Sequence, residues 1–402
     1  MSILLRKKLS VFSKIKNSFI WFFFYLISSP LLLLMIIIYP IFKIRINELE
    51  TRSIGHFSIP VEIFLSELKC NIHSKKRTFY IWFINKKISN HFLLKKWKKH
   101  LLIGPRFILK PIFKLIYKFE FLHFLKSPYR HWVDVKINDN WQLVDKYKVL
   151  KKTKPSINFD SSEKTIINEY LLKNKIKKNY ICFMTRSSVY LNDFKSTRDA
   201  EEKDLLEAII KYCKKNKIKA IRMGAKNEKK IRTDSKYIIQ YCTSKDKSEE
   251  LDILLPFYCN LFLGSATGLT LLPILNRKKT NYVNFFDIHN IKLEPENMID
   301  LICPKKVMKI SSKKILSYSE IYKKKLNEVL YEKDLNLMGY KSIGNSSNEI
   351  FNLLLEQEQK IKKKRTLLQK KFWEIFKKYY LYTPTYLRIS ENFLKKNRYL
   401  IK

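Results

Sequence analysis

The stretch from Gly264 to Gly268 (GSATG) has the composition of an anion-binding loop. It lies between the apolar run 261–263 and a second apolar run, which predicts a buried strand, a tight turn and the start of a helix. Small residues let the backbone approach a phosphate, the hydroxyls of Ser265 and Thr267 can donate hydrogen bonds, and free N–H groups of a first helical turn point at the ligand. A closely packed strand-to-helix turn has the same pattern, so the loop alone does not decide between the two.

Three arginines could supply positive charge to the same ligand. Arg186 and Arg222 each end a predicted strand, Gly224 follows Arg222 by two residues, and Arg198 precedes a predicted helix. A guanidinium can bind phosphate through two parallel hydrogen bonds. The chain has no D-x-D triplet, the usual ligand of a metal–diphosphate complex, so we expect no metal and no other cofactor. Each arginine could equally be an ordinary surface residue of a basic protein.

A histidine near the N-terminus is a candidate general base. His56 follows Gly55 within residues 52–57 (RSIGHF), which we predict to be a loop between a strand and a helix. Imidazole titrates near neutral pH and can take a proton from a hydroxyl group. The ring could instead only hydrogen-bond an acceptor or cap the helix. Glu62 is a weaker candidate base, and Asp252, at a predicted helix start, is either an N-cap or a ligand for a sugar.

Strands and helices alternate through the second half of the chain, which predicts a parallel, doubly wound α/β sheet. Ligands of such sheets bind outside the carboxyl ends of the strands, so the arginines and the small-residue loop are expected to meet at one edge. The predicted strands are residues 180–184, 218–221, 237–241, 261–263 and 282–285, and the predicted helices between them are residues 200–216 and 249–258.

The N-terminus predicts a membrane segment. Residues 19–42 contain no charged side chain and are long enough to cross a bilayer, and residues 1–18 are basic. The break at Ser28-Ser29-Pro30 also allows a re-entrant hairpin. Residues 93–102 and 107–124 alternate lysines with apolar residues, which suits either helices lying on a membrane surface or helices packed in the protein with solvated lysines.

The composition bounds the class of protein. A chain of 402 residues suits two domains, and its six scattered cysteines indicate buried free thiols in a reducing compartment. The net charge is +44, and it is concentrated at the N-terminal end: residues 1–155 hold 30 Lys/Arg and 8 Asp/Glu, against 50 and 28 in the remaining 247 residues. Such a charge favours anionic lipid, nucleic acid or phosphorylated substrates without distinguishing them.

An ordered set of motifs resembles a family of bacterial glycosyltransferases found with surface-polysaccharide genes. The resemblance covers the chain from about residue 45 to its end. The matching stretches are residues 52–57 (RSIGHF, against R-I-G-H-L), 197–199 (TRD) with 221–224 (IRMG, against V-I-R-M-G), 251–255 (LDILL, against L-D-I-F-L), 262–269 (FLGSATGL, against F-I-G-T-S-G-L), 348–350 (NEI) and 387–394 (LRISENFL).

The resemblance implies a GT-B-like fold of two Rossmann-like domains, a nucleotide-sugar donor and no obligatory metal. It places His56 as the catalytic residue at the cleft between the domains, with Arg52 and Gly55 on the acceptor side. The residues expected to bind the donor are Arg186, Arg198, Arg222, Gly224, Asp252, Gly264, Ser265, Thr267 and Gly268.

We therefore expect a membrane-associated glycosyltransferase whose acceptor is lipid-linked or a surface polysaccharide. Its catalytic domains would lie at the inner membrane and face the cytoplasm. We expect an anionic membrane surface as a partner and no nucleic acid. One alternative is a basic nucleic-acid-binding protein, although the sequence contains no nucleic-acid recognition motif. The other is a non-catalytic component of a polysaccharide assembly complex. The expected segments are residues 1–18 (basic), 19–42 (membrane helix or re-entrant hairpin), 43–155 (Rossmann-like acceptor domain with basic amphipathic helices), 156–360 (Rossmann-like donor domain) and 361–402 (basic, helical).

Overall fold

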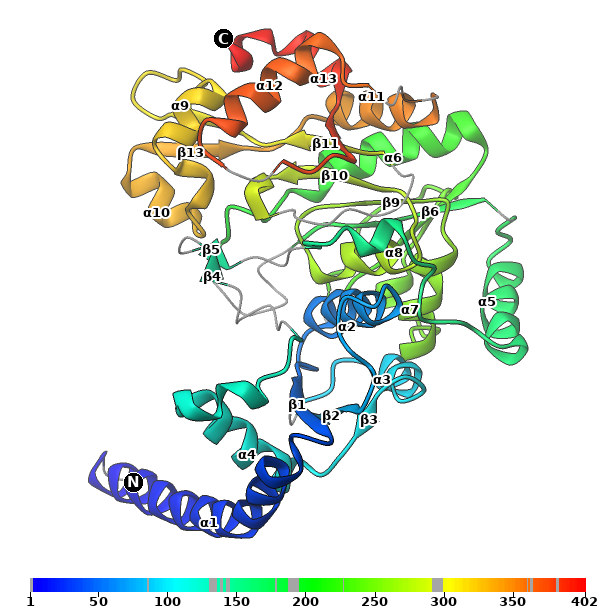
Figure 1. Ribbon diagram of the computed structural model, residues 1–402. Coiled ribbons are helices and arrows are strands. Elements are labelled where there is room, and N and C mark those ends of the chain that lie inside the picture. Colours follow the sequence, from blue (N-terminus) through cyan, green and yellow to red (C-terminus); the bar gives the residue numbers. More distant parts are fainter. Residues whose placement is uncertain are drawn as a thin grey trace.

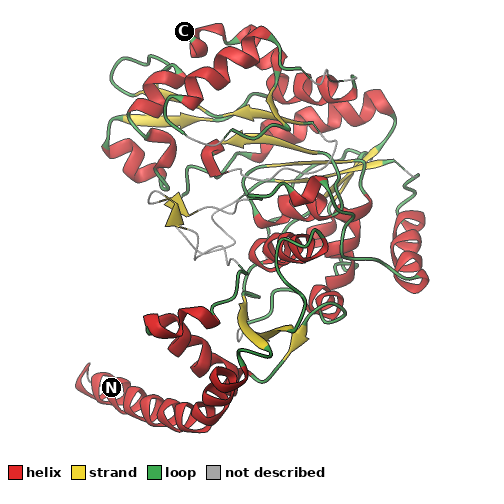
Figure 2. Cartoon of the chain, in the orientation of Figure 1, coloured by secondary structure: helices red, strands yellow, loops and turns green. Residues whose placement is uncertain are grey.

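Two parallel β-sheets organise the chain, which confirms the α/β class (Figure 1, Figure 2). A seven-stranded sheet forms the centre of the larger part, and a three-stranded sheet lies between it and the N-terminal helix. The computed structural model describes residues 3–84, 87–129, 136–137, 140–141, 145–177, 179–186, 195–226, 228–290, 299–359, 361, 364–380 and 383–402.

The seven-stranded sheet is parallel throughout and doubly wound, as the sequence predicts. From β6 the chain adds β7 and β8 on one side, then returns to place β9, β10 and β11 on the other side. The winding therefore reverses between β6 and β9, which we call the switch point. In spatial order the strands are β14 (Leu387–Ile389), β11 (Asp300–Pro304), β10 (Thr280–Phe285), β9 (Leu261–Gly264), β6 (Tyr180–Met184), β7 (Lys219–Arg222) and β8 (Ile238–Ile239).

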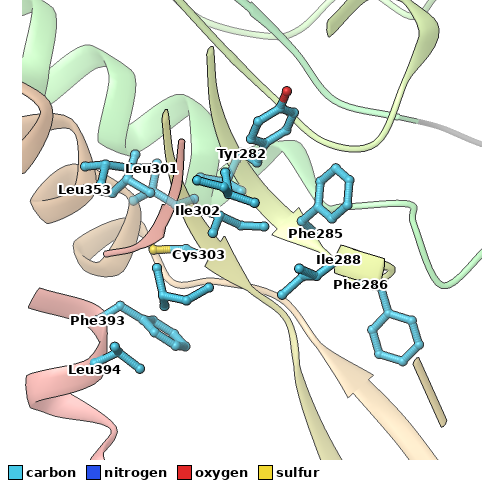
Figure 3. Packing of buried hydrophobic residues seen from close by; sticks show 14 of the residues in the cluster. Tyr282, Phe285, Phe286, Ile288, Leu301, Ile302, Cys303, Leu353, Phe393 and Leu394 are labelled. Atoms are coloured by element: carbon cyan, nitrogen blue, oxygen red, sulfur yellow. The ribbon is translucent and has the colours of Figure 1, made fainter. Parts of the chain in front are cut away.

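Each face of this sheet is buried under its own layer of helices. Strand β6 shows the alternation: Ile181 and Phe183 point to one core, whereas Tyr180 and Cys182 point to the other. Figure 3 shows the first core, where strands β10 and β11 meet Leu353 and Phe393 of the covering helices. The first layer contains α6 (Glu202–Asn216), α9 (Tyr318–Lys323), α11 (Ser347–Glu358), α12 (Leu367–Lys377) and α13 (Glu391–Lys396), and the second contains α5 (Ser161–Lys173), α7 (Glu249–Tyr258) and α8 (Leu272–Leu275).

The N-terminal sheet is smaller than the Rossmann-like domain expected for residues 43–155. It has three parallel strands, and the helices that follow the first two strands share the second core of the main sheet. Phe64 and Trp82 belong to the same buried cluster as Leu254 and Phe262, so no solvent layer separates the two parts there. These elements are β1 (Lys43–Leu49), α2 (Ile54–Lys69), β2 (Thr78–Ile84), α3 (His91–Trp97) and β3 (Leu102–Ile103).

The N-terminal apolar segment forms one helix, α1 (Ile3–Ile38), which continues through Pro30. The re-entrant hairpin is therefore wrong, because the helix does not reverse at that proline. By length and composition, the window Trp21–Ile38 could cross a membrane: its mean hydropathy is 2.3 and only 11% of it is buried.

The two predicted basic helices have different surroundings. Helix α3 is a packed helix whose Lys96 is buried against Glu163 in a charge pair. Helix α4 (Arg106–Lys118) is amphipathic, packs beside α1 and leads into the 3-10 helix η1 (Glu120–Leu125). Lys96 of α3 therefore belongs to a buried ion pair, whereas the lysines of α4 belong to an amphipathic helix beside α1.

The C-terminal residues belong to the main sheet. We assigned residues 361–402 to a separate basic helical segment, but β14 pairs with β11 at the sheet edge, and Phe372 and Phe376 of α12 lie in the first core. Helix α11 begins with a capping box formed by Ser346 and Glu349. The remaining elements are β4 (Lys136–Ile137), β5 (Asn140–Trp141), β12 (Lys306–Lys309), α10 (Glu332–Leu337), β13 (Tyr340–Ile343) and the 3-10 helices η2 (Val149–Lys151), η4 (Tyr241–Thr243), η5 (Gly268–Leu271), η6 (Ile288–Asn290), η7 (Leu326–Glu328) and η8 (Arg398–Ile401).

Candidate functional site

The switch point brings together residues that lie about 80 positions apart in sequence. Strand β6 ends before Arg186 and β9 ends at Gly264, and the two strands are parallel neighbours. The backbone N–H of Arg186 donates a hydrogen bond to Ser265 Oγ at 2.8 Å. The predicted meeting of Arg186 with the small-residue loop is therefore confirmed, and it occurs where doubly wound sheets bind their ligands.

Asp199 links Arg186 to the turn that carries Arg198. Asp199 Oδ1 lies 3.3 Å from Nε of Arg186, and Asp199 also accepts the N–H of Ser196, which fixes the turn that carries Arg198. Burial and the charge of Arg198 lower the pKa of the Arg186 guanidinium, and the opposing effects of Asp199 and Asp287 do not offset this. Nε of Arg198 is buried and has no hydrogen-bond partner among the described residues. The site thus brings two guanidinium groups to one edge of the sheet, and one of them, Arg186, faces the Asp199 carboxylate.

The turn that carries Arg198 rests on a lysine that the sequence did not single out. Lys305, directly after β11, donates hydrogen bonds from Nζ to the carbonyl oxygens of Thr197 and Asp199, both at 2.6 Å. Burial lowers the pKa of Lys305 to about 8. In a chain with so many lysines, only its position after a buried strand could have indicated this role.

The small-residue loop is a close-packing turn. After Gly264 the chain enters the 3-10 helix η5, which runs directly into the four-residue helix α8, so the expected helix begins as a 3-10 turn. A Cβ atom on Gly264 would lie 2.7 Å from Cγ2 of Thr270. Ser265 is buried, and the hydroxyl of Thr267 lies 3.6 Å from the sulfur of Met184. Within this loop, packing accounts for the small residues.

The N-terminus of α2 lies directly on this loop. We predicted residues 52–57 to be a loop, but the helix begins at Ile54. A Cβ atom on Gly55 would lie 2.9 Å from Cα of Gly268, and one on Gly268 would lie 2.9 Å from N of Gly55. We expected a cleft between His56 and the loop. At Gly55 and Gly268 the two backbones are instead in contact.

Replacing Gly55 with alanine should lower the free energy of unfolding by about 1–3 kcal/mol, because the new methyl group meets backbone atoms that cannot rotate away. Gly104→Ala is the matched control. Its Cβ would lie 2.8 Å from Cδ1 of Leu109, the end of a flexible side chain, so the loss should be smaller. Chemical denaturation of both variants measures the difference, and equal losses would contradict the contact.

His56 lies in the first turn of α2 and is half-buried. Burial lowers its pKa below 6.5, so the ring is largely neutral at pH 7 and can accept a proton. Arg52 lies just before the helix, where its exposed guanidinium forms two hydrogen bonds of 2.8 Å with Glu50. Gly55, the neighbour of His56, contacts the loop at the switch point, whereas Arg52 is held by Glu50.

Arg222 and Gly224 lie one strand away from Arg186. The Arg222 guanidinium is buried and donates to Glu202 Oε1 through Nε at 3.0 Å, and to the carbonyl oxygen of Lys229 at 2.8 Å. Glu202 also accepts the hydroxyl of Thr185 at 3.1 Å, so it ties the ends of β6 and β7 together. The contacts of Arg222 are those of a structural residue. Gly224 has a φ of +155°, a backbone conformation that residues with a side chain rarely adopt, and this accounts for a glycine at the position.

The sequence suggested Asp252 as a possible N-cap of α7, but the structure places it after the cap. Ser248 caps that helix by accepting the N–H of Leu251. Asp252 lies in the first turn, where it accepts the hydroxyl of Tyr241 at 3.0 Å and pairs with Lys247 at 2.5 Å. Its carboxylate is thus held by neighbours within the second layer of helices.

Glu62, the second candidate base, is fully buried in an ion pair with Arg277 at 3.0 Å. Arg277 follows α8 and also donates to the carbonyl oxygens of Leu150 and Leu275 at 3.0 and 2.8 Å. The pair joins α2 to the main sheet, so Glu62 is a structural residue.

The cysteines and possible metal ligands complete the chemical inventory. All six cysteines are free; five are buried, as predicted, whereas Cys70 is half-buried. Within the parts of the chain that the structure describes, no group of three or more His, Cys, Asp or Glu side chains is arranged to hold a metal ion. A metal-independent reaction stays a prediction.

Comparison with known proteins gives distant structural resemblances. No family model and no curated protein matches the chain. Among solved structures, it is similar to the glycosyl transferase family 9 protein from Veillonella parvula DSM 2008, with 11% identity and a TM-score of 0.46 over 78% of this chain and 98% of that one. It is also similar to E. coli ADP-heptose lipopolysaccharide heptosyltransferase II (10%, 0.34, over 60% and 84%) and to an E. coli heptosyltransferase with ADP (9%, 0.32, over 65% and 90%).

These similarities, with TM-scores below 0.5, are too distant to indicate the function of this chain. The fold and the site define a doubly wound α/β protein with a cationic switch point.

Proposed function

We propose that this chain is a glycosyltransferase that moves a sugar from a nucleotide-sugar to a lipid-linked or surface-polysaccharide acceptor. The donor diphosphate would lie at the switch point, against Arg186, Arg198 and the backbone of the Ser265 turn, without a metal ion. Arg222, Gly224 and Asp252 would support this edge of the sheet and not touch the donor. The GT-B-like arrangement belongs to the same proposal, with α2 and the three-stranded sheet forming a reduced acceptor side.

The observation that carries the proposal is the Arg186–Arg198 pair. Burial and mutual repulsion disfavour two neighbouring guanidinium groups, and the described carboxylates do not offset the effect on Arg186. A diphosphate would supply negative charge and acceptors, including one for the buried Nε of Arg198. Glycosyl transfer needs this chemistry because negative charge grows on the leaving diphosphate as the glycosidic bond breaks.

His56 would act as the general base on the acceptor hydroxyl. Its lowered pKa keeps the imidazole unprotonated at pH 7, as a base requires. The proposal places the chain at the inner membrane with its switch point facing the cytoplasm. The basic N-terminal part of the chain and its apolar helix support that location.

A panel of UDP-, GDP-, CMP-, dTDP- and ADP-linked sugars, including ADP-heptose, tests the function. We expect one nucleotide class to stabilise the full-length chain by about 2.7 kcal/mol at a concentration about 100 times its Kd, measured as a rise in Tm. The sugar that also gives turnover distinguishes heptosyl from hexosyl transfer. No response to any of them, together with salt-sensitive DNA binding, would replace the proposal with the nucleic-acid alternative.

A further inference from the structure

Helix α1 has two faces with opposite surroundings. Ser28, Leu32 and Met35 are buried on one face, and Ser28 Oγ donates a hydrogen bond to the carbonyl oxygen of Ile108 in α4 at 3.0 Å. Phe22, Leu26, Leu33 and Ile37 lie on the other face and are 59–64% exposed. Their spacing of four, seven and four residues places them in one stripe along the helix. The outward stripe is therefore apolar and uncovered in the described chain.

The exposed apolar surface continues beyond α1. Phe107 of α4 and three aromatic residues at η1, Phe119, Phe121 and Phe124, are also exposed, and Phe121 is 73% exposed. Figure 1 shows α1 and α4 side by side at the end of the molecule opposite the C-terminus. A soluble monomer rarely presents so many large apolar side chains on neighbouring elements, so this surface calls for an apolar partner.

Lysines border the same surface. The ammonium groups of Lys110 and Lys114, on α4, lie 5.6 and 4.9 Å from the ring centre of Trp21, on α1. Lys118 ends α4 and is exposed. Lysines beside an apolar face suit the boundary between acyl chains and anionic headgroups, where the aliphatic stems lie in the apolar layer and the charges reach the phosphates.

The packing of α1 argues against a transmembrane orientation. Leu32 and Met35 lie in the C-terminal half of the apolar window and share a buried cluster with Ile46 of β1 and Phe83 of β2. If the window crossed the bilayer, α4 and these strands would have to enter it as well. Each of the four cations of α4 would cost about 2.5–3.5 kcal/mol near the bilayer centre.

We infer that α1, α4 and η1 form a membrane-docking surface on which the chain lies in one leaflet of an anionic bilayer, with α1 in the plane of the interface. The helix of 36 residues is about 54 Å long, so an in-plane orientation gives it a long line of contact. The outward stripe faces the acyl chains, the lysines of α4 lie at the headgroups, and neither end of α1 crosses the membrane. This surface is independent of the proposed transferase chemistry.

Vesicle binding of the full-length chain tests the surface. We expect flotation with vesicles of phosphatidylethanolamine and phosphatidylglycerol, and weaker flotation with neutral phosphatidylcholine. The double variant Leu26→Glu/Leu33→Glu should lower the partition coefficient at least about tenfold, because it places two carboxylates against the acyl chains. The matched control is Leu172→Glu/Leu337→Glu, at positions 79% and 86% exposed on other helices, which should bind like the unmodified chain. Equal binding by the two double variants would overturn the inference.

Labelling distinguishes an in-plane helix from a spanning one without relying on those variants. A Ser2→Cys substitution in a Cys70→Ser background should stay reactive towards a membrane-impermeant maleimide when the chain is added to preformed vesicles. Protection of that cysteine would mean that α1 crosses the bilayer. A chain that does not bind vesicles but forms dimers sensitive to Leu26→Glu/Leu33→Glu would assign the surface to a second copy. Either result would overturn the inference, and neither depends on nucleotide-sugar binding.

Discussion

Replacing Arg198 with alanine should weaken binding of the nucleotide-sugar that stabilises the chain about 10- to 100-fold. This corresponds to about 1.5–3 kcal/mol, the usual contribution of hydrogen bonds to a charged group. The Arg198 guanidinium is close enough to lower the pKa of Arg186, its Nε has no hydrogen-bond partner in the described chain, and its turn is held by Asp199 and Lys305. Isothermal titration with the responding nucleotide measures the change.

Two further arginine variants test whether the loss of nucleotide-sugar binding is specific to Arg198. Arg398→Ala removes an exposed arginine of η8 and should leave the affinity unchanged. Arg222→Ala should lower Tm in the absence of nucleotide, because it leaves Glu202 without its buried partner. If Arg222→Ala abolished binding in a folded chain while Arg198→Ala did not, the donor site would lie at the end of β7 and our assignment would be wrong.

Replacing Arg277 with methionine should lower the free energy of unfolding by about 3–5 kcal/mol. Removing one partner of a buried ion pair leaves the other charge without compensation. Here the uncompensated group is Glu62, and the carbonyl oxygens of Leu150 and Leu275 also lose a donor. Denaturant titration measures the loss, and Arg398→Met is the matched control because its arginine is exposed.

The pH dependence of the Arg277→Met variant follows from Glu62. Burial raises the pKa of this carboxyl group, and Arg277 opposes that shift. Without Arg277 the pKa in the folded state rises further above its unfolded value. The folded state then holds its proton more tightly, so the variant's stability falls as the pH rises from about 4.5 through the folded-state pKa.

A second variant separates lost charge compensation from lost packing. Glu62→Leu/Arg277→Met should recover much of the stability, because apolar replacements of both partners leave no buried charge. If Arg277→Met were as stable as the unmodified chain, α2 would not be fastened to the main sheet by this pair.

Local sequence patterns predicted five of the seven strands of the main sheet and missed β11 and β14. Continuous apolar runs predicted β6 and β9, and the helix predicted at residues 249–258 is α7 with the same bounds. Alternation of strands and helices determined that the strands are parallel. That in turn placed Arg186 and the loop from Gly264 to Gly268 at one edge, which the structure confirms.

The surroundings of the site residues could not be read from the same patterns. Arg222 and Arg198 both looked like phosphate ligands because each lies beside a predicted strand or helix. Only the fold brings Glu202 to Arg222 and leaves Nε of Arg198 without a hydrogen-bond partner in the part of the chain described. The partners of these side chains come from other elements, and one sequence contains no information on such pairing.

The glycines of two distant motifs show most clearly what the sequence determines and what only the tertiary structure decides. By itself, the sequence determined only that Gly55 and Gly268 lie in short stretches of small residues next to apolar segments, because local composition is enough for that. The tertiary structure decided that the two glycines pack against each other, backbone to backbone, and that α2 shares a core with the main sheet. The physical reason is that burial of apolar surface is non-directional: it requires these segments to be covered but does not name the segment that covers them.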